Sequence, residues 1–228
     1  MARALRVEHL GLVPYGEALE LQEKRVEAVR AGSAPDTLFL LEHPPVITLG
    51  RSARRENLRL PVAELARRGF AVHEVARGGD VTLHAPGQLV GYLVCDLAAR
   101  GVPDVHRWLR GIEASLLAAL GVLGLPAAPR AGWTGVFVDD PAADAAGLAP
   151  RKIASIGVGL RGWTSWHGFA LNVTLDPHAF DVIVPCGLHA VRMTSLEREL
   201  ATRPEAAPAD LDARARAAAA AAFEAWLA

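Results

Sequence analysis

Residues 70–97 read FAVHEVARGGDVTLHAPGQLVGYLVCDL, and this stretch decides the fold. It holds three runs of apolar and β-branched residues that are typical of strands, at Phe70–Val75, Val81–His84 and Leu89–Leu97. Glycine-rich connections join the runs, and no helical pattern lies between them. Strands that cluster in this way favour an α+β fold over a regular βαβ array.

The sequence on either side adds strands and helices at irregular intervals. Further strands are predicted at residues 4–12, Thr37–Leu41, Val46–Leu49, Ile153–Leu160 and Phe169–Val173. Helices are predicted over Tyr15–Val29, Pro61–Arg68, Pro103 to about Leu123, and Asp210–Leu227. Residues 124–151 are expected to be mostly loop around a short strand at Val136–Val138. Because no repeat or linker divides the chain, we expect one domain over residues 1–228, with a mixed sheet and flanking helices.

The composition excludes several classes of function. A net charge of -1 lacks the basic footprint of a nucleic-acid-binding protein. The apolar runs are far shorter than the roughly 20 residues that cross a bilayer, and the charged N-terminal segment lacks the apolar core of a signal peptide. The chain has two cysteines, Cys95 and Cys186, and no CxxC pair. We therefore expect a cytoplasmic protein that spans no membrane and holds no zinc.

Two familiar site motifs are excluded by their context. Residues 157–162 match the dinucleotide fingerprint GxGxxG, but that fingerprint must open a helix, and this segment has the pattern of a strand. The GxxxxGK[ST] pattern of a P-loop is absent. Cys186, His189, His167 and His178 are possible metal ligands, but their spacing matches no compact metal motif. The sequence therefore predicts neither a metal nor a cofactor.

Two segments contain residue types suited to a site. Residues 77–88 combine Arg, Asp, Thr, His and Gln with two adjacent glycines, which suit a close ligand approach and a plain tight turn equally well. Pro185-Cys186-Gly187 presents a cysteine in a tight turn after an apolar run. Cys95, by contrast, lies in an apolar strand, as a buried cysteine does. Cys186 is therefore the candidate nucleophile, and it needs a cation or base nearby.

Lysine usage suggests that partner. Of 24 basic residues, only Lys24 and Lys152 are lysines, and the rest are arginines. A chain that uses arginine for plain positive charge indicates a special role for a retained lysine, because ammonium can give up its proton and guanidinium cannot. Lys152 is the candidate, although the sequence alone does not place it beside Cys186.

Five segments in order make the chain resemble the lipoyl(octanoyl) transferase family. They span about residues 39–197 and comprise Arg77–His84 with Pro86–Gln88, Lys152–Gly157, His167–Asn172, Pro185–Gly187 and Thr194–Leu196. Two positions depart from the family pattern. Ala85 stands where the family has glycine, and Thr164-Ser-Trp-His replaces Thr-Tyr-His.

The resemblance implies a fold and a site. The fold would be that of the biotin and lipoate protein ligase catalytic domains, with the acyltransferase core over about residues 39–197. Cys186 would carry an acyl thioester, and Lys152 would activate it. The substrate site would be lined by Arg77, Gly78, Gly79, Asp80, Val81, Thr82, Leu83, His84, Ser155, Ile156, Gly157, Gly168, Phe169 and Ala170.

The resemblance also implies an activity. An octanoyl (or lipoyl) group would pass from acyl carrier protein to a lysine of lipoyl domains, those of 2-oxoacid dehydrogenases and the glycine cleavage H protein, as the first step of protein lipoylation from endogenous octanoate. The donor thioester is already activated, so ATP is not needed. Two alternatives stay open: an ATP-dependent lipoate or biotin ligase on the same fold, which needs no nucleophilic cysteine, and a non-catalytic module that binds carrier protein.

Overall fold

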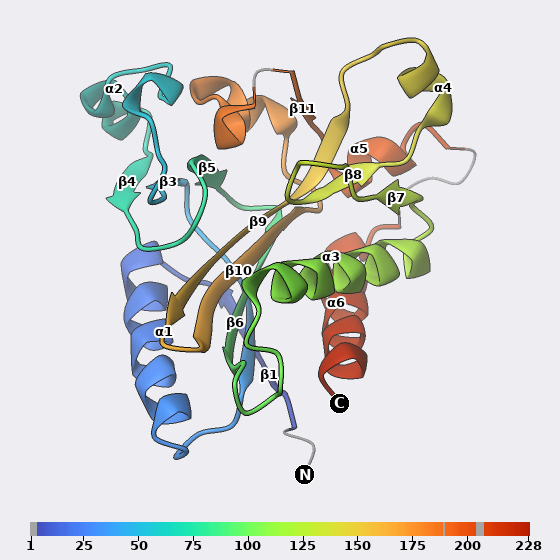
Figure 1. The fold of residues 1–228 in the computed structure, drawn as a ribbon. Helices are drawn as coiled ribbons and strands as arrows, with labels where there is room; N and C mark the ends of the chain where they lie inside the picture. Colours follow the sequence, from blue (N-terminus) through green and yellow to red (C-terminus); the bar gives the residue numbers. More distant parts are fainter. Residues whose placement is uncertain (1–3, 189, 204–207) are drawn as a thin grey trace.

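The computed structural model describes residues 4–188, 190–203 and 208–228, and it contains two sheets (Figure 1). The larger sheet has the strand order β1-β2-β6-β10-β9-β8-β7, with β11 paired to β9. Its central pairs, β2–β6, β6–β10 and β10–β9, are antiparallel, whereas β1–β2 and β11–β9 are parallel. The strands are β1 Arg6–Leu12, β2 Thr37–Glu42, β6 Gln88–Asp96, β7 Ala127–Ala128, β8 Val136–Val138, β9 Arg151–Arg161, β10 Thr164–Asn172 and β11 Arg192–Met193.

Helices cover both faces of the larger sheet (Figure 1). Helix α1 (Tyr15–Arg30) packs on β6 and β10 from one side, and α3 (Val105–Val122) with α6 (Leu211–Leu227) packs from the other. Helix α3 begins directly after Asp104, because the Asp104 carboxylate accepts hydrogen bonds from the backbone N–H groups of the first turn. Such an N-cap is worth about 1 kcal/mol. The main apolar core lies between α3, α6 and the sheet.

The smaller sheet has the order β4-β3-β5 and carries the short helix α2. Its strands are β3 Val46–Leu49, β4 Ala71–Glu74 and β5 Val81–His84, and α2 spans Val62–Arg67. A separate apolar cluster, which includes Leu65 and Phe180, fills the space behind this sheet. The 3₁₀ turns η1 Arg55–Asn57, η2 Pro177–Val182 and η3 Pro185–Gly187 lie next to it. Strand β5 therefore has one face on this cluster and its other face free for a site.

The structure confirms the predicted α+β class and the mixed sheet with flanking helices. It also places residues 157–161 inside strand β9, so the GxGxxG match does not open a helix. The second strand of the predicted pair is longer than expected, because β10 begins at Thr164 rather than at Phe169. Unpredicted elements are α4 (Pro141–Ala145), α5 (Leu196–Leu200), β7 and β11, all of two to five residues. His189, a possible metal ligand in the sequence, lies outside the described residues.

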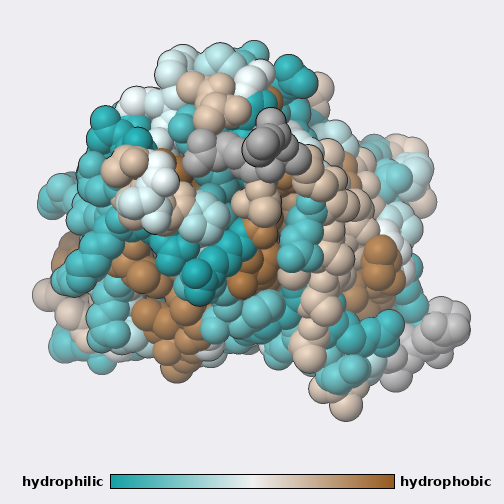
Figure 2. Space-filling model, turned by 90° about the horizontal axis from the view of Figure 1, so that it is seen from below, coloured by the Kyte–Doolittle hydropathy of each residue, from teal (hydrophilic) through white to brown (hydrophobic). Residues whose placement is uncertain are grey.

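The surface seen from the lower end of Figure 1 mixes hydrophilic and hydrophobic residues (Figure 2). Hydrophobic areas on this face are separated by hydrophilic ones. In the part of the chain that is described, no helix combines the length and hydropathy needed to cross a membrane.

Candidate active site

Cys186 sits at the tip of turn η3 in an unusual backbone conformation. Its φ is 55°, in the left-handed region that few residues other than glycine adopt. Asn57 holds the residue that precedes the turn, because its carbonyl accepts a hydrogen bond from Val184 N at 2.8 Å. Gly187 leaves no room for a side chain, since a Cβ there would lie 2.8 Å from Oδ2 of Asp80. A strained backbone held by neighbours in this way is typical of functional residues.

Lys152 points at the Cys186 sulfur from strand β9. Its Nζ lies 3.5 Å from Cys186 Sγ and donates a hydrogen bond to the carbonyl of Thr134 at 3.0 Å. The side chain is only 2% exposed, and the ammonium lies over the ring of Phe137. The structure thus brings together the two residues that the sequence singled out, although they are 34 positions apart. An ammonium at this distance stabilises a thiolate.

Gly135 makes room for the lysine. Its φ is +127°, and a Cβ at this position would lie 2.7 Å from Cε of Lys152 and 2.6 Å from the carbonyl of Ala154. The backbone N–H of Gly135 donates to the buried carboxylate of Glu113 on α3 at 2.9 Å. Helix α3 therefore fixes the loop whose Thr134 carbonyl holds the lysine.

An inner cavity opens behind Cys186, between β5 and strands β9 and β10. The space between its walls is about 470 Å³ when open solvent at the mouth is counted, and about 50 Å³ of it can hold the centre of a water molecule. Eleven of the fourteen residues predicted to line the substrate site lie on its wall, as does Cys186. They are Arg77, Gly79, Asp80, Thr82, His84, Ser155, Ile156, Gly157, Gly168, Phe169 and Ala170.

Three predicted lining residues lie elsewhere. Val81 and Leu83 belong to the apolar cluster behind the smaller sheet. The alternation of side chains along β5 explains this, since the residues at even positions face the cavity and those at odd positions face away. Gly78 is not on the cavity wall either, and its N–H instead donates to the carbonyl of Val158 at 2.8 Å.

The sequence reasoning missed three aromatic residues on the cavity wall. Tyr15 was assigned to a helix stripe and Tyr92 to a buried strand, and His167 was named as a possible metal ligand and as part of a family segment but not as a lining residue. His167 has a φ of 55°, so it and Cys186 are the two non-glycine residues with positive φ in the described ranges. The motif that contains His167 was the one available signal, because backbone strain cannot be read from composition.

Burial dominates the electrostatics of the cavity. Arg77 is buried, with its guanidinium bonded to Thr48 and to the Gly78 carbonyl, and burial lowers its pKa while the Cys186 sulfur acts in the opposite direction. Burial also lowers the pKa of His167 to about 3 and raises the pKa of Tyr15 to about 12. Both side chains are therefore neutral at pH 7. Arg77 is the cation that faces them.

A chain of hydrogen bonds runs from the cavity into the sheet. His84 Nδ1 lies 2.7 Å from Gln88 Oε1, and Gln88 Nε2 donates to Asn172 Oδ1 at 2.9 Å. Asn172 Nδ2 in turn donates to the carbonyl of Thr194 at 2.8 Å. The N–H of Thr194 donates to the carbonyl of Lys152 at 3.0 Å. The chain therefore ties the cavity wall to the strand that carries the lysine.

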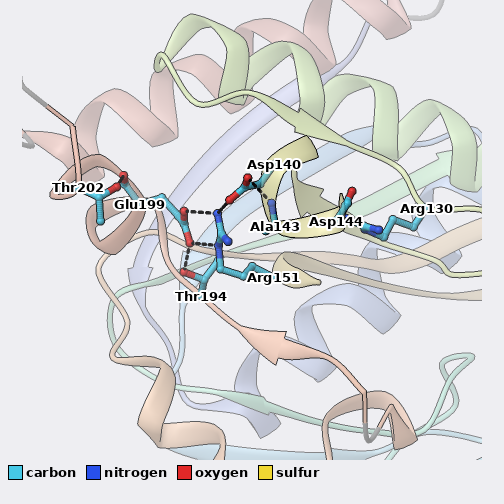
Figure 3. A network of polar contacts seen from close by, with 8 residues as sticks. All are labelled: Arg130, Asp140, Ala143, Asp144, Arg151, Thr194, Glu199 and Thr202. Carbon is cyan, nitrogen blue, oxygen red and sulfur yellow. Dashed lines mark hydrogen bonds and ion pairs between the residues drawn. The ribbon is translucent and has the colours of Figure 1, made fainter. Parts of the chain in front are cut away.

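The chain continues to the surface through an ionic network (Figure 3). Thr194 Oγ1 donates to Glu199 at 2.6 Å, and Glu199 accepts from Arg151 Nε at 2.9 Å. Arg151 also donates to Asp140 at 2.9 Å, and Asp140 caps helix α4 at Ala143 N (Figure 3). This network joins α4, α5 and the start of β9, one residue before Lys152. Residues of the segment 194–196 thereby contact the strand that carries Lys152.

Cys186 and Lys152 also line a broader outer groove. Its lining includes Trp133, Thr134, Lys152, Cys186 and Leu188. Gly79, Asp80, Ile156 and Cys186 lie on both the groove and the inner cavity, so Cys186 stands where the two meet.

A second groove lies beside Pro185 and is rich in arginine. Arg59, Arg192 and Arg198 line it, and all three side chains are exposed. Within the described residues, none of the three forms an ion pair, in contrast to Arg151 of the same groove. Among the residues that the structure describes, no three His, Cys, Asp or Glu side chains gather to hold a metal ion.

The sequence matches the family described as the lipoyl protein ligase A/B catalytic domain over residues 14–217, and the chain belongs to this family. Solved structures agree at the level of the fold. The bipartite lipoate protein ligase of Thermoplasma acidophilum superimposes with a TM-score of 0.71 at 16% identity, over 98% of this chain and 84% of that one. Lipoate-protein ligase A bound with ATP gives a TM-score of 0.66 at 16% identity, over 100% of this chain and 86% of that one.

Close relatives in sequence are octanoyltransferases, and the chain is an acyltransferase. The octanoyltransferase of Acidobacterium capsulatum is 45% identical over 88% of this chain and 82% of the relative. That of Rubrobacter xylanophilus is 47% identical over 86% of this chain and 85% of the relative. The Myxococcus xanthus octanoyltransferase is 45% identical over 86% of this chain, which spans 54% of that longer relative.

Proposed function

We propose that the chain transfers an octanoyl group from acyl carrier protein to a lysine of a lipoyl domain, through a thioester on Cys186. The observation that carries this proposal is the 3.5 Å contact between Lys152 Nζ and Cys186 Sγ at the junction of two cavities. The inner cavity suits an acyl chain, and the outer groove suits the arm of a carrier or an acceptor lysine. The names of the relatives agree with octanoyl as the group transferred.

The first half-reaction exchanges one thioester for another. The Cys186 thiolate attacks the donor carbonyl, a new C–S bond forms, and the bond to the carrier sulfur breaks. The carrier leaves as a thiolate and takes a proton from the Lys152 ammonium. One thioester replaces another, so the step needs no ATP.

The second half-reaction makes the amide. The amine of the acceptor lysine attacks the carbonyl of acyl-Cys186, a C–N bond forms and the C–S bond to Cys186 breaks. Lys152, now neutral, accepts the proton that the amine loses, and its ammonium then faces the released thiolate again. Both residues return to their starting state, which completes a turnover.

The arginine-rich groove beside Pro185, the arginine groove, supports the proposal that the acyl donor is a negatively charged protein. Arg59, Arg192 and Arg198 are exposed without ion pairs in the described chain, and Pro185 on the same groove adjoins Cys186. Unpaired charge beside a reaction centre steers partners of opposite charge. We propose that the carrier protein docks here. The acceptors would be lipoyl domains of 2-oxoacid dehydrogenases and the glycine cleavage H protein. Cys186 is a free thiol within the described residues, so a reducing cytoplasm is the proposed setting.

Intact mass spectrometry after mixing with octanoyl-carrier protein, without nucleotide, tests the proposal. We expect one octanoyl adduct, mapped to Cys186, that disappears when a lipoyl domain is added. An adduct on Cys95 would contradict the covalent scheme. A strict requirement for ATP, with full activity of Cys186→Ala, would instead make the chain a ligase.

A further inference from the structure

Glu113 on α3 is a buried carboxylate that the proposed mechanism does not use. Its side chain is 3% exposed. Oε2 pairs with Arg110 at 2.6 Å, and Oε1 accepts the backbone N–H of Gly135 at 2.9 Å. Arg110 lies one turn away on the same helix and is half exposed, and ion pairs with exposed side chains contribute little to stability. The pair with Arg110 therefore does not explain by itself why a carboxylate is buried at this position, where burial of a charge is costly.

The peptide group between Thr134 and Gly135 joins this carboxylate to Lys152. Its N–H donates to Glu113, and its carbonyl accepts from Lys152 Nζ at 3.0 Å. A peptide group is planar, and its N–H and carbonyl point in opposite directions. The carboxylate and the ammonium therefore lie on opposite sides of one peptide group. Hydrogen bonds in series polarise and strengthen one another, so the charge of Glu113 acts on Lys152 through this series, the Glu113 relay.

The Glu113 relay matters most while Cys186 is acylated. In the free protein the Cys186 sulfur lies 3.5 Å from Lys152 Nζ, and a thiolate there offsets the charge of the ammonium. A thioester sulfur is uncharged, so the acylated cysteine no longer does this. Within the described residues, the hydrogen-bond partner that Nζ keeps is the Thr134 carbonyl. The negative charge that reaches the lysine in this state is therefore that of Glu113.

We infer that Glu113 is a positioning residue for the second half-reaction, which holds Lys152 beside acyl-Cys186 and stabilises the charge that the lysine gains there. This inference rests on the proposed function. The acceptor amine forms the C–N bond, and its proton passes to Lys152 Nζ. Until the C–S bond has broken, no thiolate offsets the charge that Nζ gains. The Glu113 carboxylate does so through the peptide group, as a third group that orients and supports the base.

Single-turnover kinetics of the two half-reactions test the inference. Glu113→Gln keeps the size of the side chain and an oxygen for the Gly135 N–H but removes the charge. Charge-assisted hydrogen bonds are roughly twice as strong as neutral ones, so we expect this variant to transfer the acyl group from Cys186 to the acceptor about tenfold more slowly. Acylation of Cys186 and the KM for the acceptor should stay close to those of the wild type.

Ser115→Ala is the matched control. Ser115 is also buried on α3, and its hydroxyl donates to the Gly111 carbonyl of the same helix, so both half-reactions should keep their wild-type rates. Wild-type transfer to the acceptor in Glu113→Gln would overturn the inference. Equal slowing of both half-reactions would also overturn it, because that result means a general loss of structure.

The second experiment needs no reaction and so separates the Glu113 relay from the proposed function. The NMR shift of the Gly135 amide proton reports the strength of the hydrogen bond that it donates to Glu113. We expect this resonance to move upfield in Glu113→Gln and also in Lys152→Met, because loss of the ammonium depolarises the shared peptide group. Ser115→Ala should leave it in place. A Gly135 resonance that does not respond to Lys152→Met would overturn the relay. If it responds but wild-type Cys186 is never acylated, the proposed function fails and the relay stands.

Discussion

The inner cavity and the outer groove share Cys186 but are built differently. Most residues of the cavity wall belong to strands, and hydrogen bonds continue from them into the sheet, as in the chain from His84 to Thr194. The groove is formed largely by turns and loops, and exposed arginines lie beside it. Strand-based sites are held more rigidly than loop-based ones. If the proposed function holds, the difference teaches that the acyl group meets a rigid wall, whereas the protein partners meet a surface whose charge is exposed to solvent.

We expect the largest loss of activity from substitutions of Lys152, which contacts Cys186 where the inner cavity and the outer groove meet. If the lysine only supplied charge, Lys152→Arg would retain much of the activity. In the proposed mechanism the lysine also accepts a proton, so we expect Lys152→Arg to form acyl-Cys186 but to transfer it to the acceptor about 10²–10⁴-fold more slowly. Single-turnover kinetics of both half-reactions in Lys152→Arg and Lys152→Ala measure this. Aminolysis at the wild-type rate in the arginine variant would leave only an electrostatic role.

The second prediction concerns the acid stability of the fold next to the cavity, where buried His43 contacts Tyr92. Burial lowers the pKa of His43 to about 4, while the Val13 carbonyl opposes the shift. In the unfolded chain the pKa of histidine is about 6.5, so between these values the unfolded state binds more protons. The contribution of neutral His43 to the free energy of unfolding should therefore have its full value above about pH 6.5. It should decrease by about 3 kcal/mol as the pH falls to about 4.

Denaturant titrations at pH 7 and pH 4.5 measure this loss. The pH dependence should be smaller in His43→Gln, which removes the titrating group. His106→Gln is the control, because His106 is exposed on α3. Equal slopes in the His43 variant and the wild type would mean that His43 is not kept neutral by the fold.

The third prediction tests how closely the loop confines the lysine. In Gly135→Ala the new methyl group meets Lys152 Cε and the Ala154 carbonyl, at a φ that alanine tolerates poorly. Displacement of a catalytic group by about 1 Å costs on the order of 10²-fold in rate. We expect a loss of 10- to 100-fold in kcat with a small change in the KM of the donor. Gly132→Ala, also at positive φ but with open space around its Cβ, is the matched control. A Gly135 variant as active as its control would show that the lysine is not confined.

The smallest expected effect lies in the arginine groove. The double variant Arg59→Glu with Arg192→Glu should raise the KM for the carrier-bound donor about five- to tenfold and should flatten its salt dependence. Acylation of Cys186 by a small octanoyl thioester should be unaffected. Arg107→Glu with Arg214→Glu reverses two charges on α3 and α6 and is the control. Equal effects of the two pairs would place the donor elsewhere.

The sequence predicted those parts of the site that depend on local pattern. The turn at Cys186 and the retained Lys152 follow from residue type and spacing, and the structure brings Lys152 to Cys186 as the hypothesis required. The expectation that every residue of Arg77–His84 lines the site was wrong for Val81 and Leu83, because side chains alternate along β5. Tyr15 and Tyr92 were missed because their apolar rings fit a helix stripe and a buried strand equally well. Their place on the cavity depends on how α1 packs on β6, which no local pattern contains.

The short elements were missed for a related reason. Helices α4 and α5 have five residues each, and β11 has two. Such segments have little propensity of their own and are stabilised by tertiary contacts, here the network around Arg151 and Glu199. The positive φ of Cys186 and His167 is likewise imposed by neighbours and is invisible in composition.

The shared groove has a kinetic consequence. In the proposed mechanism, donor and acceptor both reach Cys186 through the groove that Lys152 lines, so one partner has to depart before the other arrives. Turnover then follows a double-displacement scheme, in which double-reciprocal plots at several acceptor concentrations are parallel. An excess of lipoyl domain competes with the loaded carrier for the free enzyme. The ratio of the two proteins, rather than the supply of either alone, then determines the flux.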